Sequence, residues 1–165
     1  MTTKARYCPR CAAALPHDPP VVCAACSYAL WVNPRPTGTV IIVRDREFLA
    51  LKRARPPRAG WWDLPGGFCD GRELPADAAV REAREELGLE VRLDALVGIY
   101  LSDYLYQDEL LPILDCIYLA TIVGGTLQVD PQEATDHRWL PVDSPPEMAF
   151  PNMDQALIDV RALLR

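Results

Sequence analysis

The sequence lacks the features of exported and membrane-spanning proteins. Its first residues, MTTKARYCPRC, contain no apolar stretch of the length that a secretory signal requires, and no run of 18 apolar residues occurs in the chain. An excess of positive charge is also missing, since the formal net charge is -6. We therefore expect a cytoplasmic protein without a membrane partner, and the acidic balance argues against a general nucleic-acid binder.

The chain has 165 residues, of which 50% are hydrophobic, so it can build a real core. This length suits one ordinary domain, or a domain of about 130 residues with a small module. The charge is uneven, because residues 1–36 carry +3 and the remainder carries -9. The stiff connector Asn33-Pro34-Arg35-Pro36 ends the basic part. We therefore predict a module over residues 1–36 and a domain over residues 37–165.

Six cysteines are present, and four of them form two Cys-x-x-Cys pairs: Cys8, Cys11, Cys23 and Cys26. Thiolates at this spacing can close a tetrahedron around Zn²⁺ and so stabilise a segment too short to hold itself by apolar burial. Four protein ligands leave no open position for water, which predicts a structural site in a zinc ribbon. Redox thiols, the alternative, would use one pair at the start of a helix. Cys69 and Cys116 have no such partner and are expected to be ordinary thiols.

A helix is predicted from Pro75 to Leu87. Proline suits a first helical turn, and Gly88 suits the position just past the end. The helix has one apolar stripe and one charged side. The stripe consists of Ala79, Ala83 and Leu87, and the charged side of Arg81, Glu82, Glu85 and Glu86.

Glu82 and Glu86 lie four residues apart, so their carboxylates project side by side and repel each other. A hard divalent cation such as Mg²⁺ or Mn²⁺ between them would remove that repulsion. Arg81 can pair with Glu85 and can reach Glu73 in the preceding loop, which would brace the site. The alternative is a solvated acidic helix face, the usual meaning of such a run of charges.

The spacing favours a metal site. Gly67, Glu73 and the segment Arg81–Leu89, which reads REAREELGL, match the signature of the Nudix hydrolases position by position. The chain therefore resembles that family. The resemblance implies an α/β fold, the Nudix α/β/α sandwich with a mixed sheet, and a metal held by the carbonyl of Gly67 with glutamate side chains. By position, these glutamates are Glu82, Glu85 and Glu86.

The implied reaction is hydrolysis of a P–O–P linkage. Bound cations would neutralise a diphosphate and lower the pKa of a water, and a carboxylate would then take the proton of that water. The family uses either a glutamate of the helix or one in the loop before the last strand, so the base is Glu82 or Glu133. Arg81 and Glu85 complete the expected catalytic set by bracing it.

Arg53 and two tyrosines are candidates for substrate binding. Arg53, at a predicted strand end, would contact a phosphate, although the cluster of Arg53, Arg55 and Arg58 equally suits a solvated basic loop. Tyr104 and Tyr106 could stack on a base or ribose, or could merely pack their loop.

The layout of a zinc ribbon ahead of a Nudix domain is similar to that of NADH pyrophosphatases, which also act on NAD-capped RNA. That group carries a Ser-Gln-Pro-Trp-Pro-Phe-Pro stretch, whereas residues 97–115 here read VGIYLSDYLYQDELLPILD. We therefore expect a small nucleotide substrate, a nucleoside diphosphate linked to another moiety, with ADP-ribose-like compounds first and NADH, an NAD cap or a nucleoside triphosphate next. A non-catalytic regulator or RNA-binding module is the alternative of another class. The resemblance also implies a homodimer.

The remaining pattern predicts strands and a second helix. Strands are expected at residues 39–43, 48–53, 91–93, 96–101, 113–123 and 126–129, with Gly124-Gly125 as a hairpin turn and residues 102–111 as an interruption. An amphipathic helix is expected at residues 152–164.

Overall fold

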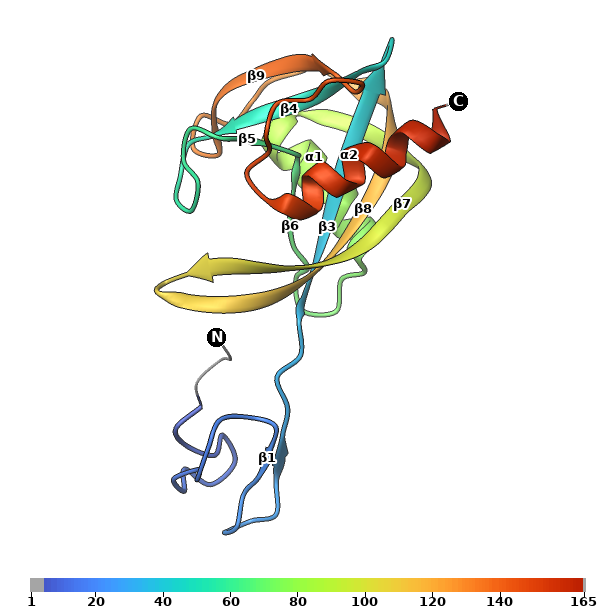
Figure 1. The fold of residues 1–165 in the computed structure, drawn as a ribbon. Coiled ribbons are helices and arrows are strands. Elements are labelled where there is room, and N and C mark those ends of the chain that lie inside the picture. The colour runs from blue at the N-terminus through green and yellow to red at the C-terminus, as the bar shows by residue number, and fades with distance from the viewer. Residues whose placement is uncertain (1–4, 165) are drawn as a thin grey trace.

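The computed structural model describes residues 5–164. The first four residues of the predicted module and the last residue of the predicted domain lie outside this range. The strands are β1 (Val21–Val22), β2 (Ala29–Leu30), β3 (Arg35–Arg44), β4 (Glu47–Arg53), β5 (Trp62–Asp63), β6 (Gly66–Phe68), β7 (Leu89–Tyr106), β8 (Glu109–Gly125) and β9 (Ala134–Pro141), and the helices are α1 (Pro75–Leu87) and α2 (Pro151–Leu163) (Figure 1). Within the described range, neither helix is long and apolar enough to cross a membrane.

A mixed sheet of seven strands forms the body of the protein. Its main path runs in the order β5-β4-β3-β8-β7, while β6 pairs with β3 and β9 pairs with β4. Strands β3 and β8 are parallel over eight residue pairs, from Arg35 opposite Ile113 to Ile42 opposite Ala120, and the other pairings are antiparallel. The central position of β3 explains why its middle is buried on both faces.

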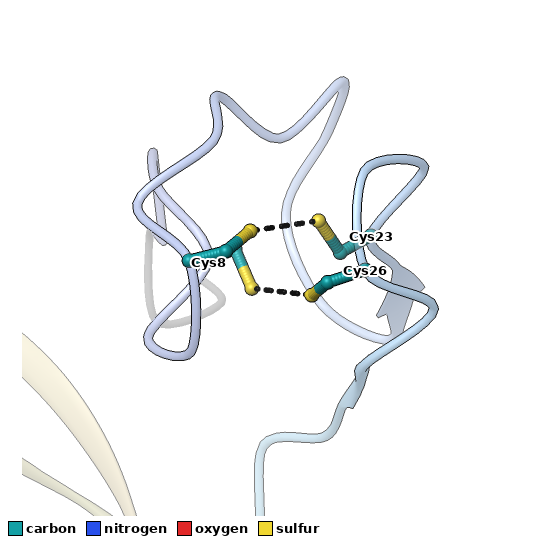
Figure 2. A group of neighbouring side chains, drawn as sticks. Cys8, Cys23 and Cys26 are labelled. Atoms are coloured by element: carbon teal, nitrogen blue, oxygen red, sulfur yellow. Dashed lines mark hydrogen bonds between the residues drawn. The ribbon is translucent and has the colours of Figure 1, made fainter.

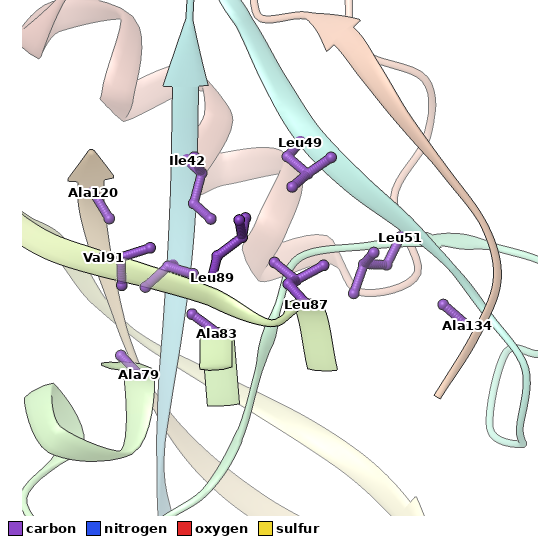
Figure 3. Packing of buried hydrophobic residues seen from close by; sticks show 11 residues of the cluster. Ile42, Leu49, Leu51, Ala79, Ala83, Leu87, Leu89, Val91, Ala120 and Ala134 are labelled. Carbon is purple, nitrogen blue, oxygen red and sulfur yellow. The ribbon is translucent and has the colours of Figure 1, made fainter. Parts of the chain in front are cut away.

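Successive side chains of β3 point to opposite faces and so divide the core in two. Val40 and Ile42 pack in the cluster that contains α1, which Figure 3 shows from close by, whereas Ile41 packs in the cluster that contains α2. The sheet therefore lies between the two helices, and the prediction of an α/β/α sandwich with a mixed sheet is confirmed.

Helix α1 has the predicted bounds, Pro75–Leu87, and ends at Gly88, whose φ of 66° is left-handed. It lies against β3 at Gly38, where an added Cβ would come within 2.7 Å of the backbone nitrogen of Ala79. A glycine at this point lets the acidic helix approach the central strand closely.

The predicted strand at residues 113–123 lies within β8, but the prediction was wrong for residues 102–111 and 124–129. Residues 102–111 do not interrupt the sheet, because β7 and β8 form one long hairpin that turns at Gln107 and Asp108, both with positive φ. Gly124-Gly125 ends β8 without a hairpin turn, and residues 126–129 are not a strand. The tip of the hairpin extends beyond the rest of the sheet (Figure 1).

Helix α2 matches the predicted helix to within one residue at each end. Its inward residues Met153, Ala156, Leu157 and Val160 are buried. The hydroxyl of Tyr100 on β7 donates a hydrogen bond of 2.7 Å to Asp159, which fixes the helix over the hairpin.

The cysteine segment precedes the sheet and contains its own two-stranded sheet, in which Val21 lies opposite Leu30. Figure 1 shows this segment joined to the body by the chain that leads into β3.

Candidate active site

The carboxylates of α1 meet the glycine turn of β6. The backbone N–H of Gly66 donates a hydrogen bond of 3.1 Å to Oε2 of Glu86. Next to it, Gly67 lies so close to Glu82 that an added Cβ would collide with the Glu82 carboxylate. The helix and the turn thus bring together Gly67, Glu82 and Glu86, three of the predicted metal ligands.

Arg81 fixes the carboxylates that surround it. Its Nε and Nη2 each lie 2.9 Å from an oxygen of Glu73, and its Nη1 lies 2.7 Å from Glu82 and 2.8 Å from Glu85. Nη2 also donates to the carbonyl of Phe68 at 3.0 Å. One guanidinium therefore ties the loop, the turn after β6 and the helix together, which is the bracing role expected from the sequence.

The environment shifts the pKa of these carboxyl groups in opposite directions. Burial, together with the charge of Glu82, raises the pKa of Glu86 well above its ordinary value. Burial also raises the pKa of Glu82, against the lowering effect of Arg81. Hydrogen bonds from Arg81 lower the pKa of Glu73 to about 2. The fold thus buries Glu82 and Glu86, where a negative charge is unfavourable, and places them near Glu73, which stays ionised.

Glu85 differs from the other acids of α1. Its side chain is 58% exposed and lies beyond Arg81, which donates to it. Of the three glutamates Glu82, Glu85 and Glu86, only Glu86 belongs to the residues that line the clefts described below.

Glu133 reaches the site through a loop that is fastened to α1. The N–H of Asp130 donates to the backbone carbonyl of Glu86 at 2.8 Å, and the N–H of Ala54 donates to the carbonyl of Glu133 at 2.9 Å. Glu86 and Glu133 line the same cleft, and the charge of Glu133 adds to burial and to the charges of Glu82 and Asp63 in raising the pKa of Glu86. An ion pair of 3.3 Å joins Glu133 to Arg55.

Two adjoining hollows extend from Glu133. The first, which we call the inner cleft, has a volume of about 180 Å³. It is lined by Thr37, Thr39, Leu51, Arg53, Arg55, Asp63, Leu64, Gly66, Gly67, Phe68, Glu86, Ser102, Tyr104, Ile113, Asp115, Glu133, Phe150, Asn152 and Met153.

The second hollow, the outer groove, has a volume of about 470 Å³ and runs beside the tip of the β7–β8 hairpin. It is lined by Arg53, Arg55, Pro56, Pro57, Tyr104, Leu105, Tyr106, Gln107, Asp108 and Glu133. Arg53, Arg55, Tyr104 and Glu133 belong to both hollows, so the candidate base lies at their junction.

Arg53 and Tyr104, the predicted substrate contacts, lie side by side in this wall. The guanidinium of Arg53 pairs with Asp63, donates to the hydroxyl of Tyr104 at 3.3 Å and lies 5.3 Å from the ring centre of Phe150. Asp63 already balances the charge of Arg53. Arg55, which is exposed and paired with Glu133 at the junction, is the better placed cation for a phosphate.

The sequence analysis missed the floor of the inner cleft. Asp115 is buried there and accepts hydrogen bonds of 2.8 Å from the hydroxyls of Thr37 and Thr39 and from the amide of Asn152. Burial raises the pKa of Asp115, and these three hydrogen bonds oppose the rise. The one local signal was the Thr-x-Thr spacing, which puts two hydroxyls on one face of β3.

The donors around Gly67 suit a hard divalent cation. Glu82 and Glu86 offer carboxylate oxygens, and Gly67, which has no side chain, lets the Glu82 carboxylate lie against its backbone, so the donors on the side chains are oxygens. A cation there would also relieve the crowding of negative charge that raises the pKa of Glu86.

The four paired cysteines converge as well. Cys8 and Cys26 have their sulfurs 3.7 Å apart, and so do Cys11 and Cys23 (Figure 2). A tetrahedron with Zn–S bonds of about 2.3 Å has edges of about 3.8 Å, so these sulfurs fit around Zn²⁺. In residues 5–164, this is the one group of three or more metal-binding side chains whose ligand atoms lie within 4.8 Å of one another.

Two thiols of this group, Cys8 and Cys26, have a shifted pKa. Burial opposes ionisation of Cys8, yet the backbone N–H groups of Arg10 and Cys11 lower its pKa to about 7. The thiol of Cys26 has its pKa raised to about 12. A thiolate is therefore accessible in the group, as a metal ligand requires.

Glu86 and Glu133 line one cleft together with Arg53 and Arg55, and Glu82 lies against Gly67 beside it. Carboxylates that can hold a cation next to basic side chains suit the hydrolysis of a phosphate anhydride, and the class of protein is that of the pyrophosphohydrolases. The chain belongs to the Nudix hydrolase family, because the model of the NUDIX domain matches residues 34–160. The family resemblance and the prediction of a hydrolytic enzyme are thereby confirmed.

Three similar proteins show the range of the family. An ADP-ribose pyrophosphatase of Methanocaldococcus jannaschii is 30% identical over 123 residues, which cover 74% of this chain and 71% of that protein. A NAD-capped RNA hydrolase NudC of Pseudomonas putida is 29% identical over 161 residues, which cover 94% of this chain and 55% of NudC. A MutT NUDIX hydrolase from Burkholderia pseudomallei has a similar structure, with a TM-score of 0.65, 32% identity and coverage of 78% of this chain and 98% of that chain.

Proposed function

We propose that the protein hydrolyses the diphosphate of a nucleoside diphosphate linked to a second moiety, with ADP-ribose-like compounds as the first candidates. The observation that carries this proposal is the position of Glu133 and Arg55 at the junction of two hollows. A diphosphate bound there has room for a group on either side. A nucleoside triphosphate would fill one side alone. The similarity to an ADP-ribose pyrophosphatase supports the same substrate class.

We assign the binding of Mg²⁺ or Mn²⁺ to the carbonyl of Gly67 and to Glu82 and Glu86, with Glu85 as an outer contributor. When bound, such a cation neutralises the diphosphate and lowers the pKa of a water molecule. Arg81 holds Glu82 in place by its hydrogen bond of 2.7 Å, while Gly66 holds Glu86. The two ligands are thus positioned before substrate arrives, which lowers the reorganisation needed in the reaction.

We assign the general base to Glu133. Glu82 is engaged by Arg81 and packed against Gly67. Glu133 lines both hollows, and its one ion-pair partner within residues 5–164 is the exposed Arg55. Arg55 can therefore turn to a substrate phosphate and release the carboxylate to take a proton from water. Under this assignment Glu133→Gln lowers kcat by about 10²–10⁴-fold at an unchanged Mg²⁺ requirement, whereas Glu82→Gln raises the Mg²⁺ concentration needed.

A second candidate substrate class is NADH or the NAD cap of RNA. The similarity to NudC extends over 94% of this chain and so reaches into the cysteine segment. NAD also carries a diphosphate between two nucleosides, and the two hollows have room for one nucleoside each, as they do for the two sides of ADP-ribose.

We propose that residues 1–36 form a zinc ribbon attached to a hydrolase domain of residues 37–165. The support is the set of sulfur positions around Cys8 and Cys26, and the use of all four thiols leaves the role of the zinc structural.

We also propose a homodimer that forms through the β7–β8 hairpin. Strand β7 is the last strand of the main sheet path, and its outward residues Ile99, Leu101 and Leu105 are exposed apolar side chains. A second copy of the same strand would cover them, since an apolar patch of this kind favours association.

The experiment that tests the substrate class uses the purified chain with Mg²⁺ and a panel of ADP-ribose, NADH, FAD, Ap4A and nucleoside triphosphates. Products are identified by mass. Release of AMP from ADP-ribose at the highest kcat/KM is the expected result. Faster hydrolysis of triphosphates, with release of pyrophosphate, would contradict the two-sided site. No turnover of any member with Mg²⁺ or Mn²⁺ would favour a non-catalytic regulator.

A further inference from the structure

The carboxamide of Asn152 is buried and only half satisfied. Asn152 is the second residue of α2, and 8% of its surface is exposed. Its Nδ2 donates to Oδ2 of Asp115 at 2.8 Å. Its Oδ1 has no hydrogen-bond partner among the described residues, although the side chain lines the inner cleft. A buried acceptor without a donor is costly, so a donor supplied by a ligand would bind there favourably.

Asp115 determines which atom of Asn152 is left over. An ionised carboxylate can only accept hydrogen bonds, so Asn152 must turn its NH₂ group toward Asp115 and its oxygen away. Thr37 and Thr39 each give their one hydroxyl proton to Oδ1 of Asp115, at 2.8 Å. Both hydroxyls keep only lone pairs for other partners. The two threonine hydroxyls therefore offer no further donor, and the unpartnered atom that Asn152 presents is the acceptor Oδ1.

The walls around this floor suit an aromatic ring. Tyr104 lies with its ring centre 5.6 Å from that of Phe150 and 5.8 Å from that of Phe68, and all three residues line the inner cleft. Aromatic walls bind any nucleobase by stacking, because every base has a π face. The choice among bases is then left to the hydrogen-bonding groups of the floor.

We propose that the inner cleft selects nucleotides whose base carries an exocyclic amino group, as adenine and cytosine do, and that Oδ1 of Asn152 accepts a hydrogen bond from this group. Asp115 is a positioning residue, since it acts through Asn152. A base with a keto oxygen at the same place brings a lone pair against a lone pair and is disfavoured. The inference rests on the proposed function in one respect, that the ligand of the inner cleft is a nucleotide.

The test measures equilibrium binding of product-like nucleotides by calorimetry without added divalent cation. AMP and IMP form one pair and CMP and UMP another, because each pair differs by the exchange of an amino for a keto group. We expect AMP to bind at least about tenfold more tightly than IMP, and CMP more tightly than UMP. Equal affinity within both pairs overturns the inference. Because no turnover is involved, that result leaves the proposed hydrolase reaction standing.

Asp115→Asn gives a sharper result than the loss of a contact. The amide at residue 115 would accept from Thr37 and Thr39 through its oxygen and donate through its nitrogen toward Asn152. Asn152 must then turn its oxygen to that donor and present its NH₂ group to the cleft. The preference is expected to change from AMP to IMP. If Asp115 served folding alone, Asp115→Asn would lower the affinities for AMP and IMP by the same factor, and that outcome would contradict the inference.

Asn152→Ala keeps the test decisive if the Asp115 variant fails to fold. Removal of the carboxamide is expected to bring the affinities for AMP and IMP to within about twofold of each other. Asn33→Ala, at an exposed position of the connector, serves as the control of the same residue type and should keep the preference. A full preference for AMP in Asn152→Ala would assign the selection to another group and overturn the inference.

Discussion

Arg81 binds both carboxylate oxygens of Glu73 through its Nε and Nη2, each at 2.9 Å, while its remaining nitrogen faces Glu82 and Glu85. This planar fork is the reason why an arginine stands at the position, because a lysine carries its charge at a single point. The geometry of the site therefore depends on Arg81, although Arg81 contacts no substrate in the proposed reaction.

Arg81→Lys is therefore expected to lower kcat by about 100-fold, since a ligand displaced by about 1 Å costs that much. The fold should survive, because the apolar stripe of α1 is untouched. Kinetics and circular dichroism of the variant provide the measurement, with Arg84→Lys, an exposed arginine of the same helix, as the control. Unchanged kcat in Arg81→Lys would contradict the bracing role.

The pair of Glu73 and Arg81 also predicts a pH dependence of stability. The pKa of Glu73 is lowered from an ordinary 4.5 to about 2, so its stabilising contribution is complete above pH 4.5 and is lost as the pH falls through 2. The difference in unfolding free energy between the wild type and Glu73→Gln should be largest near pH 6 and smaller at pH 3. Denaturant titrations at the two values measure it. A difference in unfolding free energy that is larger at pH 3 than at pH 6 would contradict a lowered pKa of Glu73.

Glu86→Gln should separate stability from activity. Burial and the charge of Glu82 raise the pKa of Glu86, so the ionised side chain destabilises the metal-free protein. The glutamine variant is expected to melt about 2–4 °C higher without divalent cation, the shift that ~1 kcal/mol gives at this chain length. With Mg²⁺ present, only the wild type gains stability from binding. The difference in melting temperature between the two proteins therefore becomes smaller or changes sign.

Hydrolysis by Glu86→Gln should fall by at least about 100-fold. Glu85→Gln is the matched control on the same helix, because its side chain is 58% exposed and already held by Arg81, and its effect should be smaller than tenfold. Equal losses of activity in the two variants would indicate that Glu85 contributes to cation binding as much as Glu86 does.

Metal analysis tests the cysteine group. About one zinc per chain is expected, and it should survive mild dialysis against EDTA because four thiolates bind it. Cys11→Ser should lose the metal, whereas Cys69→Ser, outside the group, should retain it. A wild-type protein without zinc, in which six thiols titrate freely, would overturn the site.

The proposed dimer depends on Leu101, which is 73% exposed on β7. Leu101→Glu should convert the dimer to a monomer in light scattering after gel filtration, because a charge on the apolar patch opposes its burial. Ile158→Glu, at an exposed apolar position of α2, should leave the dimer intact. A wild-type monomer at high concentration would refute the assignment.

Local signals predicted part of this structure well. Pro75, Gly88 and the spacing of Ala79, Ala83 and Leu87 gave the bounds of α1, because helix ends and stripes depend on neighbouring residues. The outer part of the β7–β8 hairpin, residues 102–111, was missed because it projects from the body and has two partly exposed faces, so the alternation of apolar and polar residues is weak there.

The floor of the inner cleft had no such signal. Thr37, Asp115 and Asn152 come from two strands and a helix that are far apart in the chain, and each is unremarkable among its sequence neighbours. Their meeting follows from the parallel pairing of β3 with β8 and from the contact of the N–H of Ala149 with the carbonyl of Trp62, which sets the start of α2. Only the assembled sheet reveals it.

The hairpin tip that borders the outer groove shares no element with the carboxylates of α1. Its length and side chains can thus diverge among descendants of this fold while bond cleavage stays intact. Residues 105–108 line the outer groove alone, so replacing them offers a way to admit new leaving groups without altering the acids of α1.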